Sequence, residues 1–289
     1  MSILLNRETR VLVQGITGRV GQAQTKWMLE YGTNIVAGVT PGKGGEEVEG
    51  VPVYNGVAQA VAERGAEASV FFVPPAAVKN AAFETIDAGI KLIVVVTEHV
   101  PVHDAMEIRA YASGRDVRLL GPTSPGIITP GEAKVGIMPG NMFQPGRIGA
   151  ISRSGTLAYE ICVDLAAAGL GQSTAVGMGA DPVPFTNLSE LLRLFDADPD
   201  TDMVVIIGEV GGTQEEHAAR FIASQMTKPV VAYIAGYSVP EGKRMGHAGA
   251  IVQGNKGTTK SKISAFQEAG VAVAEYPRDV VKLVQNKLG

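Results

Sequence analysis

Short apolar segments rich in Val and Ile alternate with amphipathic segments along the first half of the chain. The apolar segments occupy residues 11–14, 35–39, 70–73 and 92–96. Segments that are apolar on both faces are typical of parallel strands buried inside an α/β protein. The intervening pattern predicts helices over 22–31 and 76–88, each followed by the glycine that a left-handed helix end favours. The first half therefore predicts repeated βαβ units.

A stretch rich in Gly and Pro interrupts this alternation between Gly121 and Gly149. It contains Pro122, Pro125, Pro130, Pro139 and Pro145. Proline is tolerated neither inside a helix nor in a central strand. Beyond it, the pattern predicts strands at 148–151, 174–176, 203–207 and 230–234, and helices at 156–168, 188–195 and 214–225. We predict two doubly wound α/β domains, 1–122 and 147–289, joined by a linker over 123–146.

Composition narrows the class of protein. The chain has 289 residues with a formal net charge of -4 and no cluster of Lys and Arg, which argues against a nucleic-acid partner. Its single cysteine, Cys162, cannot form a disulfide within the chain, so we predict a reducing, cytoplasmic location. No apolar run reaches the roughly 18 residues of a membrane span. The first residues also lack the long apolar region of a secretory signal.

The first glycine-rich turn follows the strand predicted at 11–14 and opens the first helix. Its glycines Gly15, Gly18 and Gly21 would let backbone N–H groups approach a phosphate at the helix N-terminus. The spacing departs from the dinucleotide pattern, and Lys43 stands near the place where that pattern has an acid for a ribose. A cation there favours an anionic ligand and argues against a nicotinamide oxidoreductase. A turn that only packs the helix against the strand is the alternative.

A second turn of this kind opens the second domain, where Ser152-Arg153-Ser154-Gly155-Thr156 follows a strand and begins a helix. The helix N-terminus favours an anion, and the Arg153 guanidinium suits a carboxylate or phosphate. Ser154 as an ordinary helix N-cap is the alternative.

The loop 243–250 places His247 among small residues, where an imidazole has space around it. A neutral imidazole is a competent nucleophile near pH 7 and can hold a phosphoryl group. Glu209 follows an apolar strand, at the sheet edge where open α/β sheets bind ligands, and its carboxylate could orient an imidazole. A solvated histidine and a solvent-facing acid are the alternatives. Neither metal-ligand spacing nor a nucleophile elbow nor a Walker lysine motif accompanies them.

Together these motifs resemble the α subunits of succinate–CoA ligases (succinyl-CoA synthetases), and the resemblance extends over essentially the whole chain. The segments that carry it are 40–45, 152–156, 207–209 and 242–250, which occur in the family's order. The resemblance implies an N-terminal Rossmann-like domain that binds coenzyme A. It also implies a C-terminal flavodoxin-like, doubly wound domain that carries a phosphohistidine at His247.

The resemblance implies further site residues. For coenzyme A the matching positions are Thr17, Gly18, Arg19, Val20, Val39, Lys43, Val73, Pro74, Thr97, Glu98 and Ser124. In the second domain, Glu209 would orient His247. The residues implied to bind the phosphoryl group or the substrate acid are Arg153, Ser154, Gly155 and Pro125. No metal ligand is expected in this chain.

The implied reaction needs a partner. His247 would accept a phosphoryl group from ATP or GTP and pass it to a small dicarboxylate, and the thiol of coenzyme A would then attack the acyl phosphate. Nothing in these residues supplies a nucleotide grasp domain. We therefore expect a β subunit that carries it and brings the nucleotide with Mg²⁺, in an αβ or (αβ)₂ assembly.

Departures from the family pattern leave the substrate acid open. Thr123 and Ser124 stand where the family usually has Asn and Cys, Ala180 replaces a Gly, and Phe185 is bulkier than the usual residue. The small subunit of a malate–CoA or citrate–CoA ligase is therefore an alternative to a succinate enzyme. A non-catalytic CoA-binding Rossmann protein, without phosphorylation of His247, is the alternative from another class.

Overall fold

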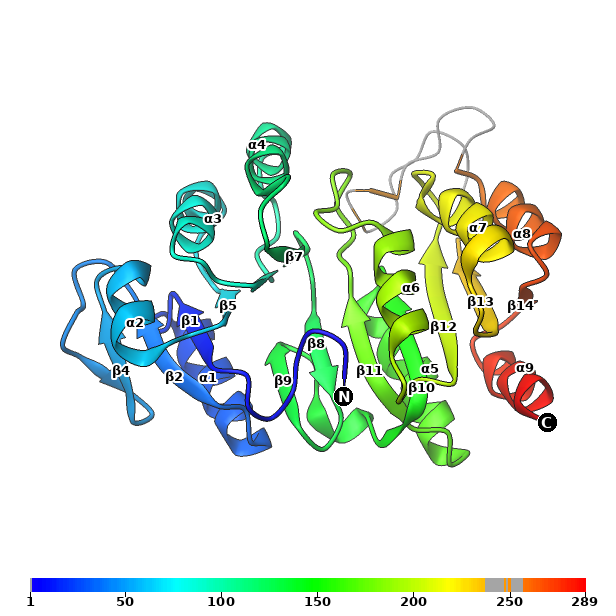
Figure 1. The fold of residues 1–289 in the computed structure, drawn as a ribbon, viewed down its shortest axis with the longest axis horizontal. Coiled ribbons are helices and arrows are strands. Elements are labelled where there is room, and N and C mark those ends of the chain that lie inside the picture. The colour runs from blue at the N-terminus through cyan, green and yellow to red at the C-terminus, as the bar shows by residue number, and fades with distance from the viewer. Residues whose placement is uncertain (1, 237–246, 248, 251–256) are drawn as a thin grey trace. The chain divides into compact units, whose positions relative to one another are not determined.

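The computed structural model describes residues 2–236, 247, 249–250 and 257–289, and it divides into two compact units. The N-terminal unit comprises Leu4–Met138 and Val183–Phe185. The C-terminal unit contains Pro139–Pro182 and Thr186–Gly289. Each unit is built around one mainly parallel sheet, so the α/β class and the two doubly wound halves predicted from the sequence are confirmed (Figure 1).

The N-terminal unit contains a sheet with the strand order β3-β4-β2-β1-β5-β6-β7. Its strands are β1 (Val11–Gln14), β2 (Ile35–Val39), β3 (Glu47–Val48), β4 (Val51–Tyr54), β5 (Ala68–Phe71), β6 (Leu92–Val95) and β7 (Arg118–Leu120). All pairs are parallel except β3 with β4. The chain moves outward from β1 in both directions, and the crevice at the carboxyl ends of β1 and β5 is where such sheets bind ligands.

Helices cover this sheet and connect its strands: α1 (Arg19–Tyr31), α2 (Val57–Arg64), α3 (Val78–Asp87) and α4 (Val102–Ala112). Gly32 ends α1 with a φ of 101°, and its N–H bonds to the carbonyls of Met28 and Leu29. Only a residue without a Cβ adopts that conformation at low cost. The helix predicted at 76–88 is preceded by one turn of 3-10 helix, η1 (Pro75–Ala77).

The predicted linker contains folded structure. Strands β8 (Gly126–Thr129) and β9 (Ala133–Gly136) pair antiparallel, and β9 packs against α1. The division between the units falls after Met138, so most of 123–146 belongs to the N-terminal unit. The prolines that suggested a linker lie outside the two strands, for example Pro130 in the turn between them, where no ladder hydrogen bond is lost.

The C-terminal unit contains five parallel strands in the order β14-β13-β12-β10-β11. They are β10 (Pro145–Ser152), β11 (Gln172–Gly177), β12 (Met203–Glu209), β13 (Val230–Ala235) and β14 (Ala272–Ala274). Every residue of β11 and β12 is buried, as expected for strands covered on both faces.

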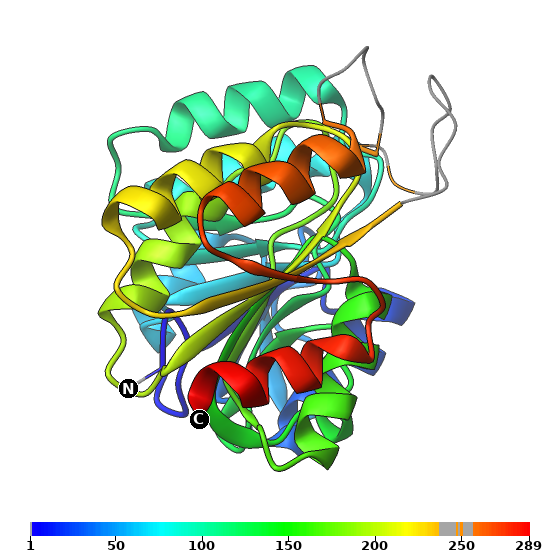
Figure 2. The same cartoon turned by 90° about the vertical axis from the view of Figure 1, so that its right-hand side faces the viewer.

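Helices lie on both faces of this second sheet. They are α5 (Gly155–Ala167), α6 (Leu188–Ala197), α7 (Gln214–Gln225), α8 (Thr259–Glu268) and α9 (Asp279–Leu288). Helices α5 and α9 pack together, and α7 packs against both α6 and α8. Figure 2 shows α7 and α8 on one side of the strands and α9 with α5 on the other. No helix among the described residues is long and apolar enough to cross a membrane.

Candidate active site

Glu209 and His247 form a direct hydrogen bond in the C-terminal unit. The distance from His247 Nδ1 to Glu209 Oε2 is 2.6 Å. Glu209 ends β12, and its side chain is 7% exposed, whereas that of His247 is 35% exposed. With Glu209 ionised, the imidazole proton lies on Nδ1 and the lone pair on Nε2. A carboxylate in this position orients the ring and increases the basicity of Nε2. The structure therefore brings together the two residues that the sequence singled out for chemistry.

Arg153 lies behind this pair, in the interior of the unit. Its Nη1 donates to the carbonyl oxygens of Glu209, at 3.2 Å, and Gly211, at 2.8 Å, and to Glu215 Oε1 at 3.1 Å. Its Nη2 lies 3.3 Å from Glu209 Oε1. Burial opposes the charge of the guanidinium, but Glu215 and Glu209 outweigh it, so the pKa of Arg153 is raised. These contacts favour an internal role over the predicted binding of a substrate carboxylate, which stays a prediction.

Two helices complete this buried group of charges. Glu215, on the first turn of α7, accepts hydrogen bonds from Lys262 Nζ of α8 as well as from Arg153, and none of the three side chains is more than 6% exposed. Burial raises the pKa of Glu215, but the positive charges of Arg153 and Lys262 outweigh burial and hold it below its usual range. Neither Glu215 nor Lys262 was among the site residues predicted from the sequence. An acid in the first turn of a helix and a lysine on a polar helix are ordinary surface features, so the sequence carried no signal for them.

Gly249 allows the backbone two residues after His247 to lie close to Ala180, which follows β11. Its N–H donates to the carbonyl oxygen of Ala180 at 2.9 Å, and the Ala250 N–H donates to that of His247 at 3.2 Å. A Cβ on Gly249 would lie 2.8 Å from the Ala180 oxygen and 3.2 Å from Arg153 Nη2. The extra methyl of Ala180 itself is buried. The remaining motif residues 242–246 and 248 lie outside the described residues.

The N-terminus of α5 lies beside the end of β12. Strands β10 and β12 are neighbours, and the Arg153 N–H donates to the Ile207 carbonyl at 3.1 Å. Ser154 is the helix N-cap, and its Oγ accepts the Leu157 N–H at 3.4 Å, so the capping interpretation is confirmed. The cap does not remove the positive end of the helix dipole, which begins at Gly155. An anion at this edge of the sheet would be stabilised by that dipole.

The first glycine-rich turn is packed tightly against neighbouring backbone. Gly15 has a φ of 74°, and a Cβ there would lie 2.7 Å from the Phe72 carbonyl oxygen. A Cβ on Gly21 would lie 2.2 Å from the Gly15 oxygen. Gly18 is the N-cap of α1, and it is exposed together with Arg19 and Val20, which begin the helix. The turn thus packs the helix tightly against the strand, and it leaves the N-terminus of α1 exposed.

The Lys43 loop is organised by Asn55. The N–H groups of Gly42 and Gly44 both donate to Asn55 Oδ1 at 2.9 Å. Lys43 itself is exposed and pairs with Glu46 at 2.8 Å, and the hydrogen bond to that carboxylate raises the pKa of Lys43. A cavity of about 350 Å³ lies beside the loop and is partly lined by Gly44, Glu46 and Asn55. Asn55 was not among the predicted site residues.

The other residues predicted for coenzyme A lie at the carboxyl ends of neighbouring strands. Val39 ends β2, while Val73 and Pro74 follow β5 and Thr97 and Glu98 follow β6. Thr97 Oγ1 donates to the Val73 carbonyl at 2.9 Å, and Thr17 Oγ1 lies 3.1 Å from Thr40 Oγ1. The structure thus gathers these positions along one edge of the N-terminal sheet.

The departures from the family pattern have structural roles in the N-terminal unit. Ser124 is buried, and its Oγ accepts the Gly126 N–H at 2.9 Å, at the start of β8. Pro125 is buried between them. Phe185 packs in the hydrophobic core of the N-terminal unit, and its N–H donates to the Gly121 carbonyl at 2.9 Å. The Phe185 ring is thus used in packing within this core.

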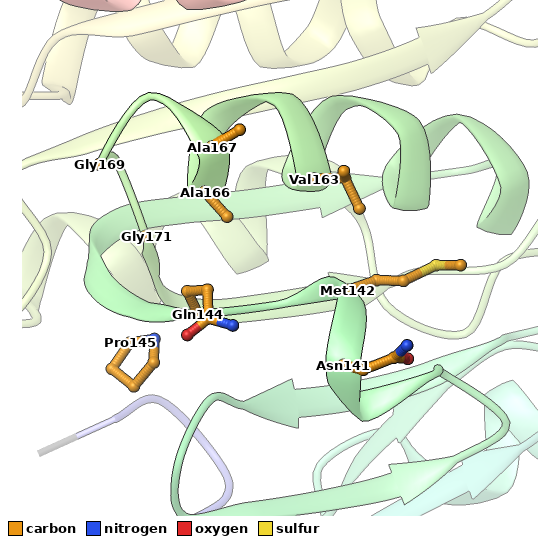
Figure 3. A pocket seen from close by; sticks show the side chains of 9 residues that line it. All are labelled: Asn141, Met142, Gln144, Pro145, Val163, Ala166, Ala167, Gly169 and Gly171. Carbon is orange, nitrogen blue, oxygen red and sulfur yellow. The ribbon is translucent and has the colours of Figure 1, made fainter.

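A second cavity, of about 500 Å³, lies at the amino ends of β10 and β11 in the C-terminal unit (Figure 3). It is lined by Asn141, Met142, Gln144, Pro145, Val163, Ala166, Ala167, Gly169 and Gly171. Pro145 begins β10, whereas Glu209 ends the parallel β12, so this cavity is far along the strands from the histidine. It contains no titratable side chain. Among the residues that the structure describes, no group of three His, Cys, Asp or Glu is arranged to hold a metal ion.

Comparison with known proteins agrees with this two-site arrangement. A family model described as a CoA binding domain matches residues 6–99, and one described as CoA-ligase matches residues 151–272. These matches and the fold define a CoA-ligase subunit with separate CoA-binding and ligase units.

The relatives identify the family. The chain is 53% identical over its whole length to the succinate–CoA ligase [ADP-forming] subunit α of Aquifex aeolicus, covering 95% of that protein. It is also 53% identical, over 99% of its length, to the corresponding subunit of Methanothermobacter thermautotrophicus, covering 97% of it. The chain belongs to the family of succinate–CoA ligase α subunits.

A solved structure shows the same fold in a longer protein. ATP citrate lyase from Methanothrix soehngenii, in complex with citrate and coenzyme A, matches 98% of this chain with a TM-score of 0.88 and 24% identity. The chain spans about half of that protein, 51%.

Proposed function

We propose that this chain is the α subunit of a succinate–CoA ligase. The enzyme would interconvert succinate, coenzyme A and a nucleoside triphosphate with succinyl-CoA, the nucleoside diphosphate and phosphate. The observation that carries the proposal is the 2.6 Å hydrogen bond between His247 Nδ1 and Glu209 Oε2. This bond supports the proposal because it would orient the imidazole so that Nε2 can act as the nucleophile, at the carboxyl ends of the second sheet's strands, where α/β proteins bind ligands.

In the proposed reaction, Nε2 of His247 attacks the terminal phosphorus of the triphosphate. The N–P bond forms as the P–O bond to the leaving diphosphate breaks. The ring becomes positively charged, and the Glu209 carboxylate stabilises it through the Nδ1–H bond. Ser154 and Gly155, at the N-terminus of α5, follow β10, the strand next to β12, and would stabilise the phosphoryl oxygens.

The second half of the reaction passes the phosphoryl group to a carboxylate of succinate, which breaks the N–P bond and restores neutral His247. The thiolate of coenzyme A then attacks the acyl carbon, forming the thioester and releasing phosphate. Pro125 and Arg153 would bind the substrate acid, as the family resemblance implies.

Coenzyme A would bind along the carboxyl edge of the N-terminal sheet. Exposed N–H groups at the start of α1 and the Lys43 ammonium would hold its phosphates. Residues at the strand ends would contact the rest of the molecule: Thr17, Gly18, Arg19, Val20, Val39, Val73, Pro74, Thr97, Glu98 and Ser124.

We also propose a β partner, because the relatives are named α subunits. That partner would carry the grasp domain for ATP or GTP with Mg²⁺, in an αβ or (αβ)₂ assembly. We propose a cytoplasmic location, which the buried and unpaired Cys162 supports. Burial raises the pKa of its thiol to about 12, so it has no role as a nucleophile.

Mass spectrometry at mild pH tests the proposal. The chain is isolated from its native lysate with whatever co-purifies, exposed to ATP and Mg²⁺, and searched for an acid-labile phosphoryl group on the His247 peptide. Finding it beside a grasp-domain partner supports the ligase. A chain that is isolated alone and remains unphosphorylated would favour a non-catalytic CoA-binding protein. Kinetics with succinate, malate and citrate then identify the acid.

A further inference from the structure

We propose that Glu215 and Lys262 are positioning residues that set the strength of the Glu209–His247 hydrogen bond through Arg153. The inference rests on the proposed function, since it concerns how His247 is made nucleophilic. It is carried by a continuous series of alternating charges from the centre of the unit to the histidine.

Glu215 contacts Glu209 both directly and through Arg153. Its Oε1 accepts the backbone N–H of Glu209 at 3.2 Å and Arg153 Nη1 at 3.1 Å. Gly208 makes this approach possible, because a Cβ there would lie 2.9 Å from Glu215 Oε1. The end of β12 is therefore held against the α7 carboxylate, and the Glu209 side chain is directed from that anchored backbone.

Lys262 pairs with the carboxylate oxygen of Glu215 that Arg153 does not contact. Its Nζ donates to Glu215 Oε2, donates to the Gly211 carbonyl at 3.0 Å and lies 3.7 Å from Glu216 Oε2. Arg153 also donates to that Gly211 carbonyl, at 2.8 Å. Lys262 is fully buried, as is Glu215. Ionised groups are expensive to bury without partners, so this arrangement persists only with both signs of charge present.

Positive and negative charges in this group have opposite effects on the protonation of His247. Among the described residues, the ion pairs that lead to it involve Arg153 between β10 and α5, Glu209 on β12, Glu215 and Glu216 on α7, and Lys262 on α8. Removing a negative charge disfavours the protonated imidazole, and removing a positive charge favours it. A purely structural contribution would not give effects of opposite sign.

The test is the pH dependence of His247 phosphorylation. The full chain, co-expressed with its partner subunit, is mixed with ATP or GTP and Mg²⁺, and the rate of phosphoenzyme formation is followed from acid to neutral pH. Only neutral His247 can attack, so the acid limb of the profile reports its titration. Glu215→Gln should move this limb to lower pH, and Lys262→Met should move it to higher pH, each by about half a unit to one unit.

Control variants distinguish a specific effect of charge from a general loss of structure. Lys134→Met removes another buried lysine, whose Nζ donates to the Met138 carbonyl in the N-terminal unit. Glu190→Gln alters another carboxylate of the C-terminal unit, the one that accepts the Asn187 N–H. Neither should move the limb. Where Lys262→Met does not fold, the double variant with Glu215→Gln removes both charges and should return the limb close to that of the wild type.

The outcomes are distinct. Opposite shifts support the inference. Shifts of the same sign, or no shift in folded variants of a phosphorylated protein, would overturn the inference and leave the proposed function intact. A wild-type complex that is never phosphorylated on His247 would overturn both.

Discussion

Lys43 and Glu46 form an ion pair across one turn of the glycine loop, with 2.8 Å between Nζ and Oε1. Both side chains are about half exposed, at 51% and 48%. The cation predicted to hold the phosphates of coenzyme A is thus paired with a neighbouring carboxylate. An incoming phosphate must compete with that carboxylate or displace it.

Glu46→Gln should therefore tighten the binding of coenzyme A. We expect the KM for CoA to fall by roughly two- to fivefold, because exposed ion pairs are individually weak. Lys43→Glu should raise it by roughly tenfold through charge reversal at the phosphates. Both effects should shrink as salt is added. Steady-state kinetics with varied CoA measures them.

Lys91→Glu is the matched control for this pair. Lys91 is also exposed and also pairs with an acid, Asp116, at 2.7 Å, but it precedes β6 at the opposite edge of the sheet. Its replacement should leave the KM for CoA unchanged. An equal change in both lysine variants, or an unchanged KM in Lys43→Glu, would contradict the assignment of Lys43.

His247→Asn should abolish turnover and leave CoA binding nearly intact, because the nucleophile and the CoA-binding positions lie in different units. Glu209→Gln keeps the shape but removes the charge that orients the ring, and should lower the rate of phosphorylation by roughly a hundredfold. Equilibrium binding of CoA and single-turnover phosphorylation measure the two effects. Loss of CoA binding in His247→Asn would show that the two sites are wrongly separated.

The bounds of two strands and one helix were the most predictable part of the fold. Val11–Gln14, Ile35–Val39 and Gln214–Gln225 have the bounds expected from the pattern, because long apolar runs and a clear helical period leave little choice. The helix Val57–Arg64 and the pair β8 and β9 were missed. Such short elements are stabilised by tertiary packing, which a local pattern does not encode.

The candidate site was predictable only where its chemistry is local. Glycine turns and a loop histidine pointed to residues that the structure places at the carboxyl ends of the strands. The buried role of Arg153 was not visible, since its partner Glu215 comes 62 residues later and Lys262 a further 47. The turn at the start of a helix and the family resemblance suggested a carboxylate or phosphate partner for Arg153. Only the fold shows the acids that pair with it.

Ser124 is predicted to stabilise the start of β8. Ser124→Ala would leave the buried Gly126 N–H without the acceptor it has at 2.9 Å, at a cost of about 1–3 kcal/mol. Ser124→Cys restores the family's usual residue but offers a weaker acceptor, so it should cost less than the alanine change. Chemical denaturation of the full chain measures both. Equal stability of all three proteins would contradict a role for this hydrogen bond.

Glu215 should also make the protein sensitive to acid. Its pKa in the folded protein lies below the ordinary value of 4.5, because Arg153 and Lys262 outweigh its burial. A lowered folded pKa means that the ionised carboxylate stabilises the fold at pH values above 4.5, and that this stability is lost as the pH falls through the folded pKa. Glu215→Gln has no such proton to bind. We expect the Tm of the wild type to decline more steeply below pH 4.5 than that of Glu215→Gln, although the wild type is the more stable at neutral pH. The carboxylates outside this buried group contribute equally to both proteins, so parallel curves of Tm against pH would show that Glu215 is not held ionised by its two cations.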